Sequence, residues 1–157
     1  MKSIVLLIDD DPVDIRAVQL LLESWEYEVV PARSGREGLE RLATVPADIV
    51  VSDVRMPGMS GEDVVAAVEQ AHPGLPVVLI TAHGDIRSAV QAMKLGAFDY
   101  VVKPPDADEF RLTLEKALEH SRLKRENARL RAELGADGLY GDRLIGSGPA
   151  MAAVFEM

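Results

Sequence analysis

The sequence IVVSDVRMPG, residues 49–58, joins an apolar run to a carboxylate and then to a turn. Apolar runs of this kind are typical of strands that are buried on both faces of a parallel sheet. Pro57 and Gly58 suit the two central positions of a type II turn, in which glycine takes the positive φ. Asp53 should therefore end a central strand and face the crevice in which open α/β sheets place their ligands. The alternative is that Asp53 only caps a helix after the strand.

Composition bounds the remaining possibilities. The 157 residues are 48% hydrophobic, which predicts one packed domain plus an extension. The absence of cysteine excludes disulfides, cysteine-ligated zinc and thiol catalysis. Neither a signal peptide nor a membrane span is recognisable in the sequence, so we expect a cytoplasmic protein. The formal net charge of −9 argues against a broad basic face for nucleic acid and is compatible with a cation site.

Predicted strands and helices alternate along the chain. The strands are predicted at residues 4–8, 27–31, 48–52, 76–81 and 98–103, each followed by a helical pattern. Asp11 and Pro12 suit the cap and first position of the first helix, and Ser34 and Ser60 open the next two. A fourth helix begins near residue 85, with Ile86, Ala89, Val90 and Met93 predicted to face inward. This alternation predicts a parallel, doubly wound α/β sheet with helices on both faces.

The fifth helix is longer than the others. Residues 106–134 contain neither proline nor glycine, and a heptad frame places His120, Asn127 and Leu134 at a and Leu123 and Leu130 at d. The g and e′ residues are opposite in charge, in the pairs Glu119 with Lys124 and Glu126 with Arg131. Asparagine at an a position favours one register of a parallel pair, so the pattern predicts a dimeric coiled coil. The alternative is a single charged surface helix that runs into a linker.

Polar side chains follow the ends of four predicted strands: Asp9 and Asp10, Asp53, Thr81, and Lys103. Each has an ordinary explanation as a cap, a surface hydroxyl or a snorkelling lysine, but the carboxyl ends of parallel strands meet at one edge. Three neighbouring carboxylates would not all stay ionised without a cation. Because every candidate ligand is an oxygen, the sequence predicts Mg²⁺.

Such a site is suited to phosphoryl groups. A metal ion, the Lys103 ammonium and the Thr81 hydroxyl around a carboxylate would cradle a phosphoryl group. Asp53 is the natural nucleophile, since carboxylates form covalent phosphoryl intermediates. No strong general base and no Ser-His-Asp arrangement is apparent beside it. The site is therefore predicted to accept a phosphoryl group rather than to turn over a free substrate.

Residues 1–120 resemble the receiver domain of two-component response regulators. The resemblance rests on Asp9-Asp10, on Asp53 with Met56-Pro57-Gly58 and Gly61, on Thr81-Ala82, and on Tyr100 before Lys103-Pro104. It implies the flavodoxin-like strand order 2-1-3-4-5 with an extended C-terminal helix. It also implies that a histidine kinase, or a small donor such as acetyl phosphate, phosphorylates Asp53. Mg²⁺ would bind Asp10, Asp53 and the backbone carbonyl of Arg55 directly, and Asp9 through water.

The same resemblance implies a conformational switch. Thr81 and Tyr100 would be the switch pair, and the Lys103–Pro104 peptide bond would be cis. Phosphorylation would repack the face of the fourth helix, fifth strand and fifth helix and so act on the linker-helix dimer, through Leu123, Asn127, Leu130 and Leu134. Pro105 departs from the family, which often has phenylalanine there.

The C-terminal residues narrow the subfamily. LIGSGPAM, residues 144–151, resembles the NtrC/DctD-type activators of sigma-54 transcription, which continue into an AAA+ ATPase and a DNA-binding domain. This implies a receiver at 1–120, a coiled-coil linker at 121–134, and a flexible linker with the start of a truncated AAA+ domain at 135–157. A full-length protein would bind sigma-54 RNA polymerase and DNA, whereas this chain has no phosphate-binding P-loop motif and is predicted to bind neither ATP, nucleic acid nor membrane.

Three other functions fit the same topology. A flavin site would want a loop rich in Ser, Thr and Gly after the first strand, where this chain has Asp-Asp-Asp-Pro. A Mg²⁺-dependent aspartyl phosphohydrolase would want a second acid two residues after the nucleophile, where this chain has Arg55. A degenerate receiver that serves only as a dimerisation module would not need the intact polar residues.

Overall fold

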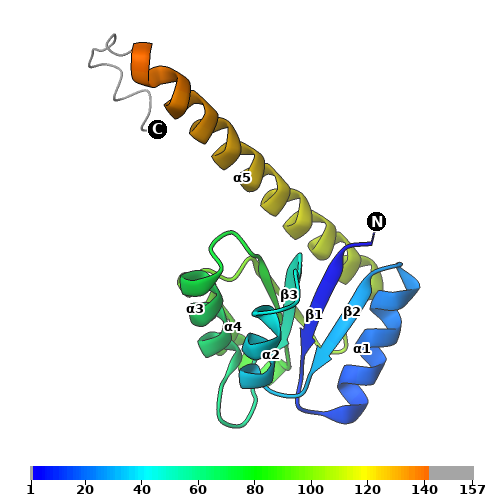
Figure 1. Cartoon of the computed structure of the whole chain (residues 1–157). Helices are drawn as coiled ribbons and strands as arrows, with labels where there is room; N and C mark the ends of the chain where they lie inside the picture. The colour runs from blue at the N-terminus through cyan, green and yellow to red at the C-terminus, as the bar shows by residue number, and fades with distance from the viewer. Residues whose placement is uncertain (1, 142–157) are drawn as a thin grey trace. The chain divides into compact units, whose positions relative to one another are not determined.

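The computed structural model describes residues 2–141 and contains a single parallel sheet (Figure 1). The strands are β1 (Ile4–Ile8), β2 (Glu28–Ala32), β3 (Ile49–Asp53), β4 (Val77–Thr81) and β5 (Asp99–Val102). The helices are α1 (Pro12–Ser24), α2 (Gly35–Leu42), α3 (Gly61–Ala71), α4 (Ile86–Leu95) and α5 (Ala107–Gly141), with a 3₁₀ turn, η1 (His83–Asp85), before α4.

The strand order is β2-β1-β3-β4-β5, and every neighbouring pair is parallel. Because each strand is joined to the next by a helix, the chain can return to the same edge before every strand, as parallel pairing requires. The predicted doubly wound, flavodoxin-like fold with an extended C-terminal helix is confirmed. The direction of winding reverses between β1 and β3, which places the ends of these two strands at the topological switch point.

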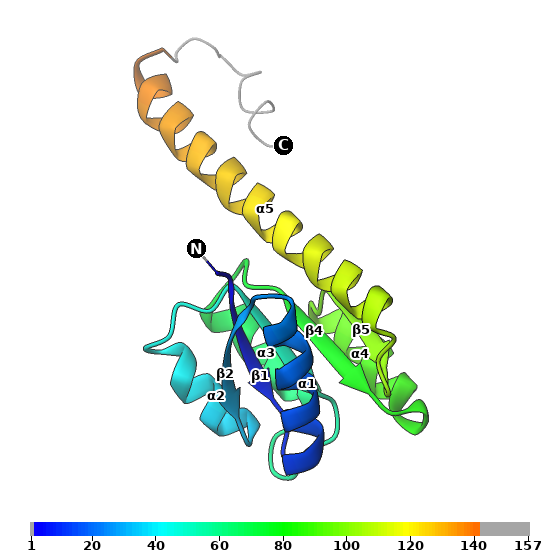
Figure 2. The same ribbon diagram turned by 90° about the vertical axis from the view of Figure 1, so that its right-hand side faces the viewer.

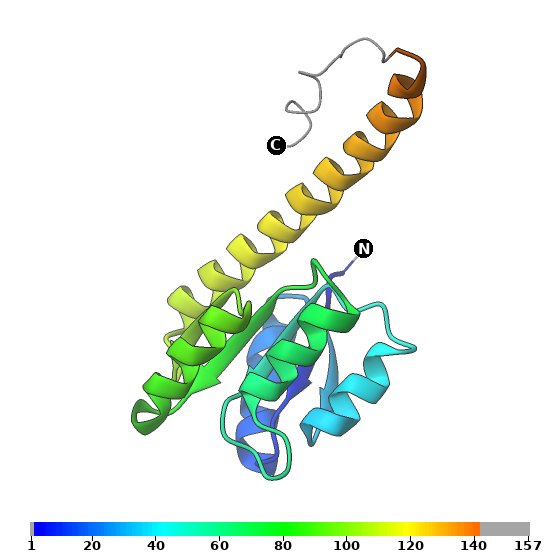
Figure 3. The ribbon, with the colours of Figure 1, turned by 90° about the vertical axis from the view of Figure 1, so that its left-hand side faces the viewer.

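The strand side chains point alternately into two hydrophobic cores. Leu6, Ile8 and Val50 pack under α2, α3 and α4, whereas Val5 and Leu7 pack under α1 and α5. Figure 2 shows α1 in front of the sheet, and Figure 3, from the opposite side, shows α2 and α3 in front of it. Strands that are buried on both faces explain why these stretches are continuously apolar in the sequence.

Local signals set the starts of α1 and α3. Asp11 caps α1, and its Oδ1 accepts hydrogen bonds from the amides of Val13 and Asp14 at 2.8 and 3.1 Å. Ser60 forms a capping box at the start of α3. Gly58 takes a φ of +82°, as the predicted turn requires.

One helix face differs from the prediction. Val90 of α4 is 42% exposed, whereas Ala89 and Ala92 are fully buried. At about 100° per residue, Val90 lies about 100° around the helix from Ala89 and about 160° from Ala92, so it turns away from the core.

The fifth helix is longer than predicted. It continues to Gly141, so residues 135–141, predicted as the first part of a flexible linker, are helical. Isolated glycines weaken a helix by about 1 kcal/mol each but do not end it, and the next proline is Pro149. The rest of the predicted linker and the predicted start of an AAA+ domain lie outside the described residues.

The chain divides into two compact units, Met1–Ser121 and Arg122–Met157. The first unit includes the start of α5. Within it, the His120 ring lies 5.5 Å from the ring of Phe98, and the Ser121 hydroxyl donates to the Gly74 carbonyl at 3.1 Å. Among the described residues, no helix has the length and apolar character needed to cross a membrane.

Candidate functional site

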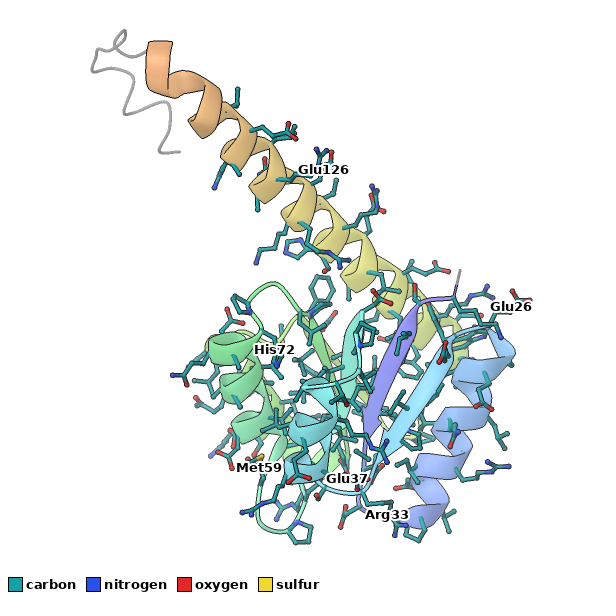
Figure 4. All side chains as sticks on the ribbon, in the orientation of Figure 1. Glu26, Arg33, Glu37, Met59, His72 and Glu126 are labelled. Carbon is teal, nitrogen blue, oxygen red and sulfur yellow. The ribbon has the colours of Figure 1, made fainter. Side chains whose placement is uncertain are left out.

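Three predicted carboxylates meet at the carboxyl edge of the sheet. Asp9 and Asp10 follow β1, Asp53 ends β3, and one carboxylate oxygen from each lies within 4.8 Å of the other two. The strand arrows point toward this edge in Figure 4, where the labelled Arg33, Glu37 and Met59 also lie. The labelled His72, the C-cap of α3, lies toward the opposite edge.

Backbone hydrogen bonds fix two of these carboxylates. The Asp9 amide donates to the carbonyl of Ala32 at 3.1 Å, and the Asp9 carboxylate accepts the amide of Asp11 at 3.0 Å. In Asp53, Oδ1 accepts the amide of Val54 at 2.8 Å. The other oxygen, Oδ2, is the one directed at Lys103.

Lys103 is the cationic centre of the site. Its Nζ lies 3.3 Å from Asp53 Oδ2, 3.6 Å from Asp9 Oδ2 and 3.0 Å from Asp14 Oδ2. The peptide bond between Lys103 and Pro104 is cis, as predicted. The structure thus brings the predicted residues Asp9, Asp53 and Lys103 together. Asp14, which was not predicted, is a further partner of Lys103.

Asp14 was missed by sequence reasoning. Its position in the first turn of α1, three residues after the predicted cap Asp11, was a usable signal, because that turn directly follows the end of β1. What the sequence could not show is which face of the turn is directed at Lys103, 89 residues further along the chain.

The electrostatics of the site favour a bound cation. Burial raises the pKa of Asp9 to about 6; the hydrogen bond from the Asp11 amide opposes the shift, and the negative charge of Asp53 adds to it. Burial would lower the pKa of Lys103, but the hydrogen bond with Asp14 and the charges of Asp53 and Asp9 outweigh it, so that pKa is raised. Three clustered carboxylates are the hard oxygen donors that Mg²⁺ prefers, so the residues present fit this ion.

Thr81 and Tyr100 differ in their placement. Thr81 is fully buried at the end of β4; its carbonyl accepts the Lys103 amide at 2.8 Å, and its hydroxyl donates to the carbonyl of Ala82 at 3.1 Å. Tyr100, on β5 opposite Leu79, is half-buried at the margin of the core under α2, α3 and α4. Thr81 is therefore joined to the site by its backbone hydrogen bond with Lys103. Tyr100 lies on the neighbouring strand β5, against the core under α2, α3 and α4.

A surface ion pair joins two loops beside the site. The guanidinium of Arg55 donates to Asp85 Oδ1 through Nε at 3.0 Å and through Nη2. Asp85 stands at the N-cap of α4, yet its side chain makes no capping hydrogen bond, because Arg55 engages it. This pair was also missed, since nothing in the local sequence relates the loop after β3 to the turn after β4.

Gly61 is required by close packing against the site. A Cβ at this position would lie 2.7 Å from the carbonyl oxygen of Asp53 and 2.9 Å from the Cα of Val54. The Gly61 amide donates to the Val54 carbonyl at 2.7 Å. The start of α3 thus lies directly against the backbone that carries Asp53.

The predicted dimer residues lie on the second unit of the chain. Leu123, Leu130 and Leu134 are 52%, 44% and 68% exposed, and Asn127 is also exposed. The charged residues here pair along their own helix, Arg129 with Glu126 and with Glu133 at 2.9 Å. His120, predicted at an a position, is exposed in the first unit, and its ring lies 5.5 Å from that of Phe98.

Comparison with known proteins identifies relatives across most of the chain. Residues 5–115 match the response regulator receiver domain model. The transcriptional regulatory protein ZraR of Escherichia coli O157:H7 is 37% identical over 147 residues, covering 94% of this chain and 32% of that protein. GlrR of Escherichia coli K12 is 43% identical over 117 residues, covering 74% and 26%. The DNA-binding transcriptional regulator NtrC of the same strain is 36% identical over 156 residues, covering 99% and 32%.

Solved structures agree with this result. A receiver domain protein from Clostridium thermocellum has a TM-score of 0.74 and 33% identity, covering 77% of this chain and 98% of that one. NtrX from Brucella abortus, in complex with ADP, has a TM-score of 0.78 and 33% identity, covering 83% and 30%. The chain spans about a third of the length of the curated relatives ZraR and NtrC.

Proposed function

The chain belongs to the response regulator receiver domain family, of the NtrC-like kind, and from this membership we propose that Asp53 is its phosphoacceptor. Receiver domains are regulatory parts of two-component systems. The observation that carries the proposal is the position of Asp53: its Oδ2 lies 3.3 Å from Lys103 Nζ, and its carboxylate belongs to the group of three clustered carboxylates.

The proposed reaction is a phosphoryl transfer onto a carboxylate. Oδ2 of Asp53 attacks the phosphorus of a phosphohistidine on a histidine kinase, or of acetyl phosphate. An acyl phosphate P–O bond forms while the P–N bond of the phosphohistidine, or the P–O bond to acetate, breaks. The imidazole or acetate carries away the bonding electron pair. Lys103 would neutralise charge on the phosphoryl oxygens.

Mg²⁺ is the proposed cofactor. Asp10, Asp53 and the backbone carbonyl of Arg55 would hold it, with Asp9 through water. When bound, the ion would offset the negative charge of the carboxylates and of the incoming phosphoryl group.

The proposed output is a population shift. The Thr81 hydroxyl, which now donates to the Ala82 carbonyl, would exchange this partner for a phosphoryl oxygen. Tyr100, half-buried on β5, would move inward. The repacked surface of α4, β5 and α5 would then alter pairing of the helical linker in a homodimer. In a longer protein this pairing would regulate a sigma-54 activator.

Incubation with acetyl phosphate and Mg²⁺ tests the phosphoacceptor role. We expect the intact mass of the chain to rise by one phosphoryl group, and Asp53→Asn to abolish this increase. Asp108→Asn, which neutralises an exposed acid at the start of α5, should leave it unchanged. An unmodified wild-type chain would contradict the proposal, and sustained release of phosphate over many turnovers would support a phosphohydrolase instead.

A further inference from the structure

Lys103 has a second strong partner besides the proposed phosphoacceptor. Its ammonium donates to Asp14 Oδ2 at 3.0 Å and to Asp53 Oδ2 at 3.3 Å. The shorter of the two hydrogen bonds is thus made to the residue outside the group of three clustered carboxylates. The three donors of the ammonium share one nitrogen, so each acceptor that draws this nitrogen closer affects its distance from the other acceptors.

The geometry of α1 holds Asp14 in place. The Asp14 amide is the second of the two amides that the capping carboxylate of Asp11 binds, at 3.1 Å. Ile15, the next residue, is buried in the core under α1 and α5. The Asp14 backbone is therefore fixed from both sides, while its side chain is 44% exposed and Lys103 is 23% exposed. Such an ion pair is partly solvated and can be broken at modest cost.

We propose that Asp14 is a positioning residue that competes with the phosphoryl group on Asp53 for Lys103. This inference rests on the proposed function of Asp53. Once Asp53 carries a phosphoryl group, Lys103 must direct its ammonium at the phosphoryl oxygens. Asp14 continues to attract the same ammonium. Asp14 thereby lowers the affinity of the site for a phosphoryl group. It also draws Lys103 away from the clustered carboxylates, which favours cation binding.

The test compares the full chain with Asp14→Asn by calorimetry, with MgCl₂ alone and with beryllium fluoride at saturating Mg²⁺. We expect Asp14→Asn to bind beryllium fluoride about two- to fivefold more tightly and Mg²⁺ about two- to fivefold more weakly. A structural role for Asp14 would weaken both. Glu23→Gln removes one negative charge from the other end of α1, about 13 Å away along the helix, and should change neither affinity.

Repeating the Mg²⁺ titration in the Lys103→Gln variant shows whether Asp14 acts through Lys103. In Lys103→Gln no ammonium can be released, so adding Asp14→Asn should reduce Mg²⁺ affinity by less than it does in the wild-type chain. An equal reduction in both backgrounds, or affinities that do not move in opposite directions, would overturn the role of Asp14. If the wild-type chain bound no beryllium fluoride, the proposed phosphoacceptor function would fail as well.

Discussion

The two oxygens of Asp53 have different surroundings, and this difference prepares one of them for chemistry. Oδ1 is held by the Val54 amide at 2.8 Å, whereas Oδ2 accepts a hydrogen bond from Lys103 at 3.3 Å. The backbone hydrogen bond fixes the plane of the carboxylate without using Oδ2. Single residues around this plane decide how much charge the site carries.

Asp9 should make the metal-free protein less stable as pH rises. Its pKa in the folded state is about 6, above the ordinary value of 3.8, so the folded chain binds its proton more tightly than the unfolded chain does. The stabilising contribution of the Asp9 proton is therefore fully present below about pH 4 and is lost as pH rises through about 6. Without Mg²⁺ at pH 7.5, Asp9→Asn should raise the unfolding free energy by about 1–2 kcal/mol.

Urea unfolding at pH 4 and pH 7.5 checks this. The gain from Asp9→Asn should be confined to the higher pH, and millimolar Mg²⁺ should reverse it, because the ion then stabilises only the carboxylate form. A gain of equal size at both pH values would contradict the prediction.

Gly61→Ala should distort the backbone that carries Asp53. The added Cβ would meet main-chain atoms of Asp53 and Val54, which cannot move independently of β3. We expect a loss of about 2–4 kcal/mol in unfolding free energy and a weaker Mg²⁺ affinity. In Gly84→Ala the new Cβ has no atom within 4 Å, so this variant is the matched control and should resemble the wild type in both measurements.

At the scale of elements, the starts of α1 and α3 beside the site are set by side-chain caps. Ser60 is the clearest case: its hydroxyl accepts the Asp63 amide at 3.2 Å, and the Asp63 carboxylate accepts the Ser60 amide at 3.1 Å. The residue that follows is Gly61, which packs against Asp53. The cap thus orients the helix at the point where it contacts the site.

Ser60→Ala should lower the unfolding free energy by about 1 kcal/mol, because an amide of the first turn loses its acceptor. Thermal or urea unfolding measures the change. Ser60→Asn, which provides another capping oxygen, should restore most of the loss. If both variants were equally destabilised, the hydroxyl would be acting through something other than the cap.

At the scale of the whole molecule, the exposed leucines of the second unit bear on whether two chains associate. Leu123 and Leu130 lie on one heptad seam and are about half exposed in the single chain, at 52% and 44%. Apolar residues repeated at this spacing are typical of helices that bury them against a partner. The pattern supports the proposed homodimer.

Replacing Leu123 and Leu130 together by lysine should dissociate the dimer, because each pair would place two charges in an apolar seam. Sedimentation of the 157-residue chain over a range of concentrations measures the dimer affinity. Replacing Ala128 and Ala132, which lie off the seam, by lysine adds the same charge and should leave the affinity unchanged. A dimer that resists the leucine substitutions would exclude the helix from the interface.

The sequence determined the elements and their order. The apolar period, the caps at Asp11 and Ser60, and the turn at Gly58 all depend on residues close together in the chain, and each was predicted correctly. The site edge was also predictable, because in a parallel sheet residues such as Asp53 and Lys103 at strand ends must share one edge.

The tertiary structure decided which side chains meet there. Asp14 reaches Lys103 across 89 residues, and Arg55 reaches Asp85 across 30. The start of α1 meets the end of β5, and the loop after β3 meets the turn after β4, only once the strands have assembled into the sheet. Val90 shows the same limit, because the helical period predicts an apolar stripe on α4, but packing against the sheet decides where that stripe is centred. Local physics therefore sets the elements, and the charge balance of the site arises only from their packing.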